Sequence, residues 1–286
     1  MTEMYMNHPK PTLIGASMFY WGQRTFIMGI VNVTPDSFSG DGLADNIEAA
    51  VAQAKRMEAE GADIIDVGGE STRPGAPEVD DEEEIRRVVP VIEQLKSEIK
   101  IPISIDTCKA SVAEAAVTAG ADLLNDVWGL KRDSRLAEVA ARRNRPVILT
   151  ASQRDASVSD IMPAVEGHLK WAIAQAEGLG VASENIIVDP GFGFGKTVGQ
   201  NLEIIRKLGE LKSLGKPILL GVSRKSTIGR VLGDVPAGER LEGTLTADVL
   251  GIAHGADIIR VHDVSAHVKA VKVADAIVRG WIEENG

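Results

Sequence analysis

The chain has 286 residues and a net charge of −10, and its composition, 44% apolar and 25% charged, is that of an ordinary globular protein. This composition excludes disordered, collagen-like and coiled-coil chains, and the sequence lacks the run of about 18 apolar residues that a membrane span needs. No tract of lysine and arginine stands out, so we expect neither a nucleic-acid nor a membrane partner. The single cysteine, Cys108, and an opening without a basic-then-apolar pattern predict a cytoplasmic enzyme.

Eight short aliphatic runs, rich in β-branched residues and bounded by glycine, proline or charge, predict buried strands. They lie at 26–32, 63–69, 101–106, 122–127, 146–150, 185–191, 217–223 and 257–262. Amphipathic stretches between the runs predict helices, the clearest at 46–61 and 80–99 and the last at about 265–280. The acidic residues that open 80–99 suit the positive end of a helix dipole.

Strands that alternate with helices in this way predict an α/β fold, a (β/α)8 TIM barrel that occupies residues 26–286 as one domain. Residues 1–25 are expected to form an extension, in which TLIGASMFYWGQRT predicts a β-hairpin that closes the bottom of the barrel. The alternative is an open doubly wound sheet, which usually carries G-x-G-x-x-G at its first strand-to-helix turn. The corresponding segment here, VNVTPDSFSG, lacks that motif, which favours the barrel.

Active sites of such barrels are built at the carboxyl ends of the strands, so the residues there are candidate site residues. Nearly every predicted strand ends in, or runs into, a polar side chain, and these are Asn32, Arg73, Asp106, Asn125, Asp126, Thr150, Asp189, Lys225, Arg260 and His262. Each has a structural alternative, since Asp106 or Asp126 can cap a helix, Asp189 can hold a turn and His262 can be a hydrogen-bonded core histidine. Their occurrence together at one end of the barrel predicts an active site.

The mixture of side chains indicates a ligand with two chemical parts. Asp106, Asn125 and Asp189 suit a planar heterocycle with N–H donors along one edge. The residues that suit an anion such as a phosphate are Arg73, Lys225, Arg260 and His262. Asn32 can offer an oxygen to Mg²⁺, which proteins usually hold with few side chains together with substrate phosphates. The set therefore predicts transfer from a phosphorylated heterocycle.

Seven segments carry a resemblance to a known family. They are MGIVNVTPDSFS (28–39), DVGGESTRPGA (66–76), SIDTCKA (104–110), AGADLLNDV (119–127), IIVDPGFGFGKT (186–197), GVSRKS (221–226) and GADIIRVHDV (255–264). In this order they closely resemble dihydropteroate synthases, over roughly residues 26–280. The resemblance implies a barrel enzyme that joins 6-hydroxymethyl-7,8-dihydropterin diphosphate to para-aminobenzoate, releasing pyrophosphate and forming 7,8-dihydropteroate. It also implies Mg²⁺ as cofactor and a homodimer formed through helices on the outer face of the barrel.

The resemblance implies a role for each matching position. The pterin-edge residues are Asp106, Asn125 and Asp189, with Lys225 over the pterin ring. The contacts to diphosphate and Mg²⁺ are Asn32, Arg260 and His262. The residues near para-aminobenzoate are Thr72, Pro74, Phe194 and Ser226, with Arg73 on the mobile second loop and Asp36 and Phe38 on the mobile first loop. In the implied mechanism the C–O bond to diphosphate breaks early, Asp106 and Asp189 stabilise the cationic methylene, and Arg260, His262 and Mg²⁺ stabilise the leaving group.

The segment ILTASQRD (148–155) departs from the family, which usually reads Leu-Met-His-Asn after the fifth strand. Thr150 and Ala151 replace the methionine and histidine, and Thr150 is expected to lose apolar contact with the pterin worth about 1 kcal/mol. Two alternatives therefore stay open, a non-catalytic pterin-binding paralogue and a methyltetrahydrofolate methyltransferase of the same barrel group. The presence of Arg73, SRKS (223–226) and Arg260-Val261-His262 favours the synthase.

Overall fold

The computed structural model describes residues 8–33, 47–71, 78–155 and 157–281, and within these ranges eight parallel strands form one ring. The strands are β3 (Phe26–Asn32), β4 (Ile64–Gly68), β5 (Ile103–Asp106), β6 (Leu123–Asp126), β7 (Val147–Thr150), β8 (Ile186–Asp189), β9 (Leu219–Leu220) and β10 (Ile258–Val261). Their order in the sheet is β8-β7-β6-β5-β4-β3-β10-β9, and a parallel bridge between Val188 and Ile218 joins the last strand to the first. The predicted TIM barrel is confirmed.

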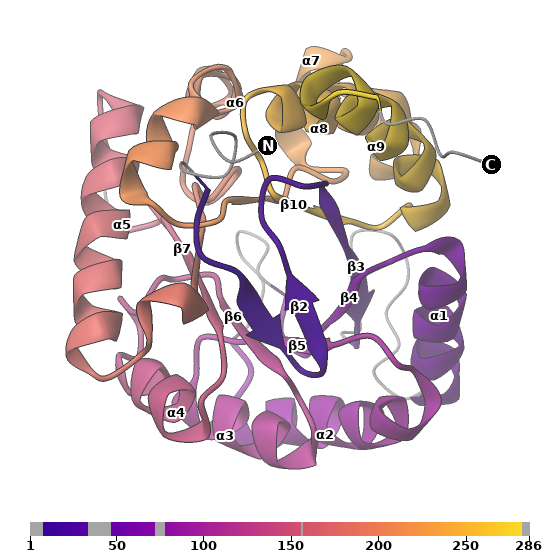
Figure 1. Cartoon of the computed structure of the whole chain (residues 1–286), viewed down its shortest axis with the longest axis vertical. Coiled ribbons are helices and arrows are strands. Elements are labelled where there is room, and N and C mark those ends of the chain that lie inside the picture. Colours follow the sequence, from indigo (N-terminus) through magenta and orange to yellow (C-terminus); the bar gives the residue numbers. More distant parts are fainter. Residues whose placement is uncertain (1–7, 34–46, 72–77, 156, 282–286) are drawn as a thin grey trace.

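Helices surround the ring of strands (Figure 1). They are α1 (Ile47–Glu60), α2 (Asp81–Glu98), α3 (Ala110–Ala119), α4 (Arg135–Arg143), α5 (Ile161–Gly178), α6 (Val198–Arg206), α7 (Ser226–Val231), α8 (Leu241–Ala253) and α9 (Val264–Arg279). The start of α2 follows from its sequence, because the Asp80 side chain accepts from the Glu83 N–H and acidic residues fill the first turn. Among the described residues, no helix combines the length and apolar character that crossing a membrane requires.

Alternate residues of each strand point into the barrel, and the character of these inward residues changes along the strands. An aliphatic layer lies toward the amino ends, formed by Met28, Ile64, Leu123, Ile148, Ile187, Leu219 and Ile258. Two residues farther along their strands, the inward positions are polar on five of them, at Asp66, Asn125, Thr150, Asp189 and Arg260. The outward residues pack against the helices and form the main aliphatic core. Two residues along each of these strands thus separate the aliphatic bottom of the barrel from the polar carboxyl end, where the candidate site residues lie.

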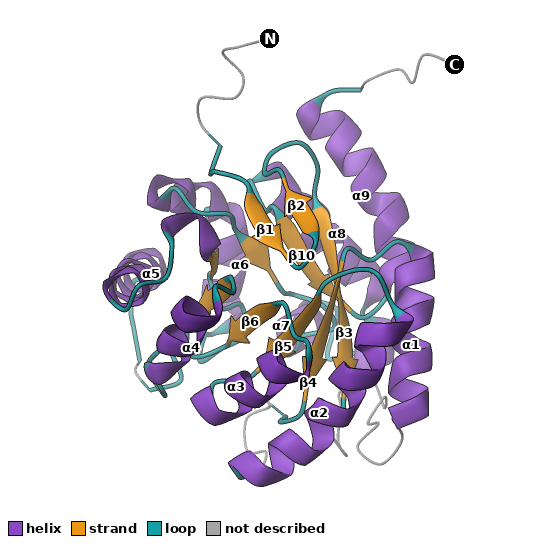
Figure 2. Cartoon of the chain, turned by 60° about the horizontal axis from the view of Figure 1, so that its bottom comes forward, coloured by secondary structure: helices purple, strands orange, loops and turns teal. Residues whose placement is uncertain are grey.

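The N-terminal hairpin closes the bottom, as expected from the sequence. Strands β1 (Thr12–Ile14) and β2 (Ser17–Phe19) pair antiparallel and lie across the amino ends of the barrel strands (Figure 2). Ile14, Phe19 and Trp21 are buried on the aliphatic layer, and the Phe19 and Phe26 rings lie 4.6 Å apart. The Trp21 indole donates to the Thr12 hydroxyl, so the buried polar atoms of the cap are paired.

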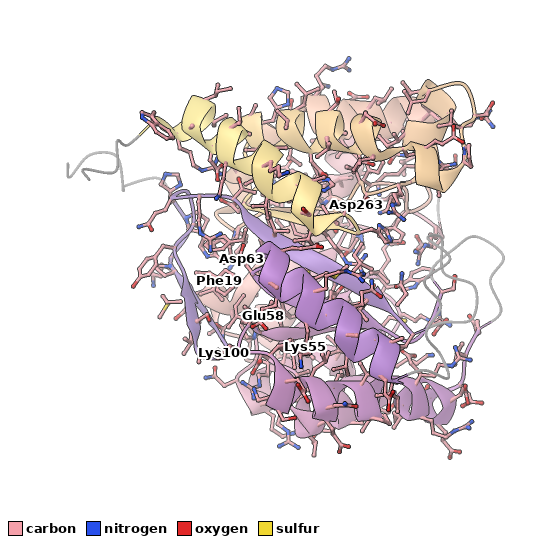
Figure 3. The ribbon with its side chains drawn as sticks, turned by 90° about the vertical axis from the view of Figure 1, so that its right-hand side faces the viewer. Phe19, Lys55, Glu58, Asp63, Lys100 and Asp263 are labelled. Atoms are coloured by element: carbon pink, nitrogen blue, oxygen red, sulfur yellow. The ribbon has the colours of Figure 1, made fainter. Side chains whose placement is uncertain are left out.

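Polar contacts fix the edge of the barrel near the hairpin. Asp63 accepts from the Ile27 N–H at 2.8 Å and pairs with Arg24, while Glu58 accepts from the Lys100 N–H at 2.7 Å. Figure 3 shows Phe19, Asp63, Glu58 and Lys100 near the hairpin and Asp263, which follows β10, farther toward the other end. These contacts join the segment after the hairpin, the end of α1 and the segments that precede β4 and β5.

The strand predicted at 217–223 is shorter than expected and covers only Leu219–Leu220. At both ends of this short strand, hydrogen bonds to side chains replace the missing backbone pairing. Asp257 accepts from the Ile218 N–H at 2.9 Å, and the Ser223 hydroxyl accepts from the His262 N–H at 3.1 Å. Because these bonds satisfy the backbone without regular pairing, an aliphatic pattern alone overestimates the strand.

Candidate active site

An ion-pair network crosses the carboxyl end of the barrel. The Arg260 guanidinium on β10 pairs with Asp66 on β4, with Nε 2.6 Å from Oδ2, and with Asp106 on β5, with Nη2 2.8 Å from Oδ2. Asn125 on β6 donates to the same Asp66 oxygen at 3.0 Å. Asp66 is completely buried and Asn125 nearly so. One guanidinium therefore holds two carboxylates in a setting where an unpaired charge would be costly.

The network shifts the proton affinity of its members. Burial raises the pKa of Asp106, and the positive charge of Arg260 only partly opposes that rise. For Arg260, burial alone would lower the pKa, but the carboxylates of Asp66 and Asp106 raise it overall. Arg260 therefore stays charged and available to an anion, whereas the charge of Asp106 depends on what lies beside it.

A second group of charges lies at the ends of β8 and β9. Asp189 accepts from the Gly191 N–H at 2.7 Å, and burial raises its pKa while the charge of Lys225 lowers it. The Lys225 ammonium donates to the Phe192 carbonyl and lies 4.3 Å from the centre of the Phe194 ring. Burial lowers the pKa of Lys225 to about 8. A carboxylate, an ammonium and an aromatic ring thus border one space.

His262 is held as a neutral imidazole. Its Nδ1 lies 2.9 Å from the Ser223 hydroxyl, and burial, together with the charges of Arg224 and Arg260, lowers its pKa to about 3. Arg224 is itself paired with Asp263. The neutral imidazole can therefore serve an anion as a hydrogen-bond donor.

Three inward-facing polar atoms in the polar part of the barrel are buried and have no hydrogen-bond partner among the described residues. They are Asp66 Oδ1, Ser104 Oγ and Thr150 Oγ1. Buried polar atoms are normally paired, so an unpaired group inside the barrel marks a place for water or a polar ligand. Since Asn125 lies on the strand between those of Ser104 and Thr150, these atoms and the ion-pair network border the same region.

The structure brings most of the sequence-predicted site residues to this end of the barrel. Asn32, Gly68 and Asp106 are partners across β3, β4 and β5, so no side chain stands between Asn32 and Asp106. Ser226 is the first residue of α7. The five further candidates Asp36, Phe38, Thr72, Arg73 and Pro74 lie outside the described residues.

Asp126 differs from the other candidates, because its carboxylate accepts from the backbone N–H groups of Trp128 and Leu130. It holds the turn after β6, and α4 begins only at Arg135, so it does not cap that helix. Among the described residues, no group of three or more His, Cys, Asp or Glu side chains is arranged to hold a metal ion.

Sequence reasoning missed several residues that build the site. Asp66 stands inside the aliphatic run DIIDVGG, and a charge within such a run was a usable signal. Ser223, beside His262, and Lys196, which donates to the carbonyls of Ala151 and Gly191, carry no comparable signal in the sequence. The only sequence signal for Arg154 is its position in ILTASQRD (148–155), the segment that departs from the family pattern.

A model of the family described as pterin binding enzyme matches residues 28–262. A dihydropteroate synthase of Clostridium beijerinckii is 52% identical over 267 residues, covering 93% of this chain and 99% of the relative, and that of Bacillus subtilis is 47% identical over 271 residues, covering 95% and 93%.

Solved structures agree with these relatives. A dihydropteroate synthase of Clostridium difficile, obtained in the presence of pteroic acid, has a TM-score of 0.87 at 52% identity, with 92% of this chain and 100% of that one covered. The Xanthomonas albilineans enzyme with 4-aminobenzoic acid has a TM-score of 0.88 at 42% identity, with 94% and 98% covered. The chain therefore belongs to the dihydropteroate synthase family of pterin-binding enzymes, which are transferases of folate biosynthesis.

Proposed function

We propose that the carboxyl end of this barrel binds 6-hydroxymethyl-7,8-dihydropterin diphosphate and para-aminobenzoate and condenses them to 7,8-dihydropteroate and pyrophosphate. The observation that carries the proposal is the network in which Arg260 pairs with Asp66 and Asp106 while Asn125 donates to Asp66. It places an anion-binding cation beside hydrogen-bonding groups for a heterocycle, as this reaction requires. Each step below follows from the charge and position of these residues.

The pterin edge is assigned to Asp106, Asn125 and Asp189. Carboxylate oxygens accept from the ring N–H and amino groups, and the Asn125 amide supplies both a donor and an acceptor. The unpaired atoms of Ser104 and Thr150 in the same region support a polar occupant. Lys225, whose ammonium lies beside Asp189 and the Phe194 ring, covers the pterin ring.

Breaking the C–O bond to diphosphate leaves positive charge on the pterin methylene and negative charge on the leaving group. The carboxylates of Asp106 and Asp189 stabilise the first, and the Arg260 guanidinium stabilises the second. Neutral His262 donates an N–H to the leaving oxygens. The amine of para-aminobenzoate then forms the new C–N bond and loses a proton to solvent, so little protein acid–base chemistry is needed.

Mg²⁺ fits this site only as an ion shared with the substrate. The amide oxygen of Asn32, across Gly68 from Asp106, is a suitable hard ligand, but the described residues hold no carboxylate cluster for a resident ion. When bound, Mg²⁺ would neutralise charge on the diphosphate. Phe194 and Ser226 are assigned to the para-aminobenzoate side, with Thr72, Arg73, Pro74, Asp36 and Phe38 on the two loops.

We also propose a homodimer in the cytoplasm, built from a hairpin extension (1–25) and a catalytic barrel (26–286). Helix α9 exposes Val273 and Ile277, and Trp281 follows at the same four-residue spacing, with Ile277 77% exposed. Val273 and Ile277 lie on one stripe of α9, Trp281 lies beyond the end of the helix, and exposed apolar stripes of this kind serve as contact surfaces between subunits. Light scattering on the full chain, with Ile277→Glu as the variant, tests this surface.

Asp189→Asn tests the assignment of the pterin edge. The amide oxygen can still accept from Gly191, but the amide N–H₂ then faces ring donors where an acceptor is needed. We expect pterin binding measured by calorimetry to fall at least 100-fold, and formation of 7,8-dihydropteroate to be lost. Near-native pterin affinity in the variant would remove Asp189 from the site. Pterin binding by the wild type without product formation would instead indicate a non-catalytic paralogue.

A further inference from the structure

Arg154 is a cation at the barrel mouth that the reaction described above does not use. It lies in the loop after β7, within the segment that departs from the family pattern. Its guanidinium carbon lies 4.2 Å from the centre of the Phe194 ring and 4.9 Å from that of Trp128. The loops after β6 and β8, the two strands that flank β7, each supply one of these rings, so the guanidinium is held between the loops on either side of its own.

Backbone contacts make this placement rigid. The Gln153 N–H donates to the Phe194 carbonyl at 3.1 Å, and Lys196 donates to the carbonyls of Ala151 and Gly191 at 2.7 and 2.8 Å. Gly195 has a φ of +73°, and a Cβ there would lie 2.3 Å from the carbonyl carbon of Gln153. The loops after β7 and β8 therefore approach so closely that only glycine fits, and Arg154 projects from a preorganised platform.

The charges around Arg154 favour an anionic ligand. The Lys225 ammonium lies 4.3 Å from the same Phe194 ring, so two cations flank one aromatic side chain. Burial lowers the pKa of both groups, the charge of Arg154 lowers that of Lys225 further, and the carboxylate of Asp106 raises both in return. A ligand carboxylate at this edge of the barrel mouth would offset the positive charge of Arg154 and form charge-assisted hydrogen bonds with its guanidinium.

The strand order decides which anion of the reaction this is. In the ring of strands, β7 lies opposite β3, which ends in Asn32, and three places from β10, which carries Arg260 and His262. The residues assigned to the diphosphate therefore lie on the far side of the barrel mouth from Arg154. We propose that Arg154 binds the carboxylate of para-aminobenzoate and selects acceptors that carry this charge. The proposal rests on the proposed function for its two substrates.

The test is steady-state kinetics of the full chain with para-aminobenzoate and its uncharged analogue 4-aminobenzamide as acceptors. Arg154→Gln should raise the KM for para-aminobenzoate about tenfold, because a charge-assisted contact is lost, with kcat within twofold. The KM for the pterin diphosphate and the kcat/KM for 4-aminobenzamide should stay unchanged. Arg154→Lys should restore part of the affinity, since it keeps the charge but not the planar fork.

Arg132→Gln is the matched control, because Arg132 lies 5.7 Å from the Trp128 ring but pairs with Glu78. Its kinetics should stay within twofold of wild type. An equal loss of kcat/KM for both acceptors in Arg154→Gln would show that the residue acts through loop shape, and a rise confined to the KM for the pterin diphosphate would assign it to that anion. Either result overturns the proposal.

Failure of the proposed function would show separately, as a wild type that forms no dihydropteroate. Calorimetric titration of para-aminobenzoate into wild type and Arg154→Gln would then still test whether Arg154 binds the carboxylate. Equal affinities would refute it, and a roughly tenfold loss in the variant would support it. Melting temperatures of both variants confirm that each is folded.

Discussion

At the amino end of the barrel, Phe19 and Trp21 pack on an aliphatic layer, and their polar neighbour Thr12 is hydrogen-bonded. Two residues farther along the strands, the barrel instead holds the ion pair of Asp66 and Arg260. The first region gains free energy from apolar burial, and each pairing in it is complete. The second region holds buried charges and unpaired polar atoms, which cost free energy in the absence of a ligand. Stability and chemistry are thus assigned to opposite ends of the same strands.

The largest contrast is expected for the charge pairs of the two ends. Arg260→Met leaves Asp66 and Asp106 buried without their cation, which should lower the free energy of unfolding by about 3–5 kcal/mol. Arg24→Met removes an ion pair with Asp63 at the hairpin end, where Arg24 is about half exposed, and should cost less than about 1 kcal/mol. Urea denaturation compares the two variants. Equal costs would contradict the division between the ends.

Arg260→Met should also abolish Mg²⁺-dependent binding of pyrophosphate, measured by calorimetry. Arg260 holds down the burial-raised pKa of Asp106, so its removal raises that pKa further. A carboxyl group whose folded pKa is raised contributes most stability at low pH and loses that contribution as pH rises through the folded pKa. The loss of unfolding free energy caused by Arg260→Met should therefore be smaller at pH 5 than at pH 8. Unchanged pyrophosphate binding would place the diphosphate site elsewhere.

At the packed end, Trp21→Ala should cost about 3 kcal/mol or more, because it opens a cavity in the cap and leaves Thr12 without its donor. The neighbouring Tyr20→Ala is the control, since Tyr20 is exposed and its loss should stay within about 0.5 kcal/mol. Assayed well below its melting temperature, Trp21→Ala should keep kcat/KM within twofold of wild type. A large fall in kcat/KM would show that the cap also positions the site.

The same division explains how far the sequence could predict this molecule. Aliphatic runs such as FIMGIVN mark strands because burial on both faces leaves little room for polar residues. Carboxylates and arginines at strand ends mark the site because parallel strands bring those ends together. Arg154 could not be found in this way, since the loops after β7 and β8 fix its position through tertiary contacts that no local pattern encodes. Asp66 could have been found, because a charge in the middle of an aliphatic run is unusual.

A smaller effect is expected from the pH dependence of activity at the carboxyl end of the barrel. Burial lowers the pKa of Lys225 to about 8, so this ammonium loses its charge as pH rises through 8. The kcat/KM for the pterin diphosphate should then fall about tenfold per pH unit, since this parameter reports the free enzyme. Because the pKa of Lys225 is lower in the folded protein than its ordinary value of 10.5, the protein becomes more stable as pH rises from about 8 toward 10.5. Over this range the activity and the contribution of Lys225 to stability should therefore change in opposite directions. Lys225→Arg should remove the alkaline fall, and its persistence would exclude Lys225 as the cause.

The smallest effect is expected at Thr150, the last residue of β7. It points inward like Ile148, pairs with Asp189 across the sheet, and its hydroxyl is buried without a partner among the described residues. A polarisable methionine against the pterin ring should therefore tighten binding by about 1 kcal/mol, or roughly fivefold. Losing the hydroxyl breaks no hydrogen bond within the described part of the protein.

Thr150→Val separates the two contributions, because it removes the hydroxyl with almost no change of volume. If the hydroxyl bonds to the pterin, Val should weaken pterin binding while raising the melting temperature of the free protein, since a buried unpaired group is gone. If only apolar contact matters, Val should leave affinity unchanged and Met should raise it. Unchanged affinity in both variants, with a lower melting temperature for Met, would show that position 150 only fills the barrel, where a longer side chain overpacks it.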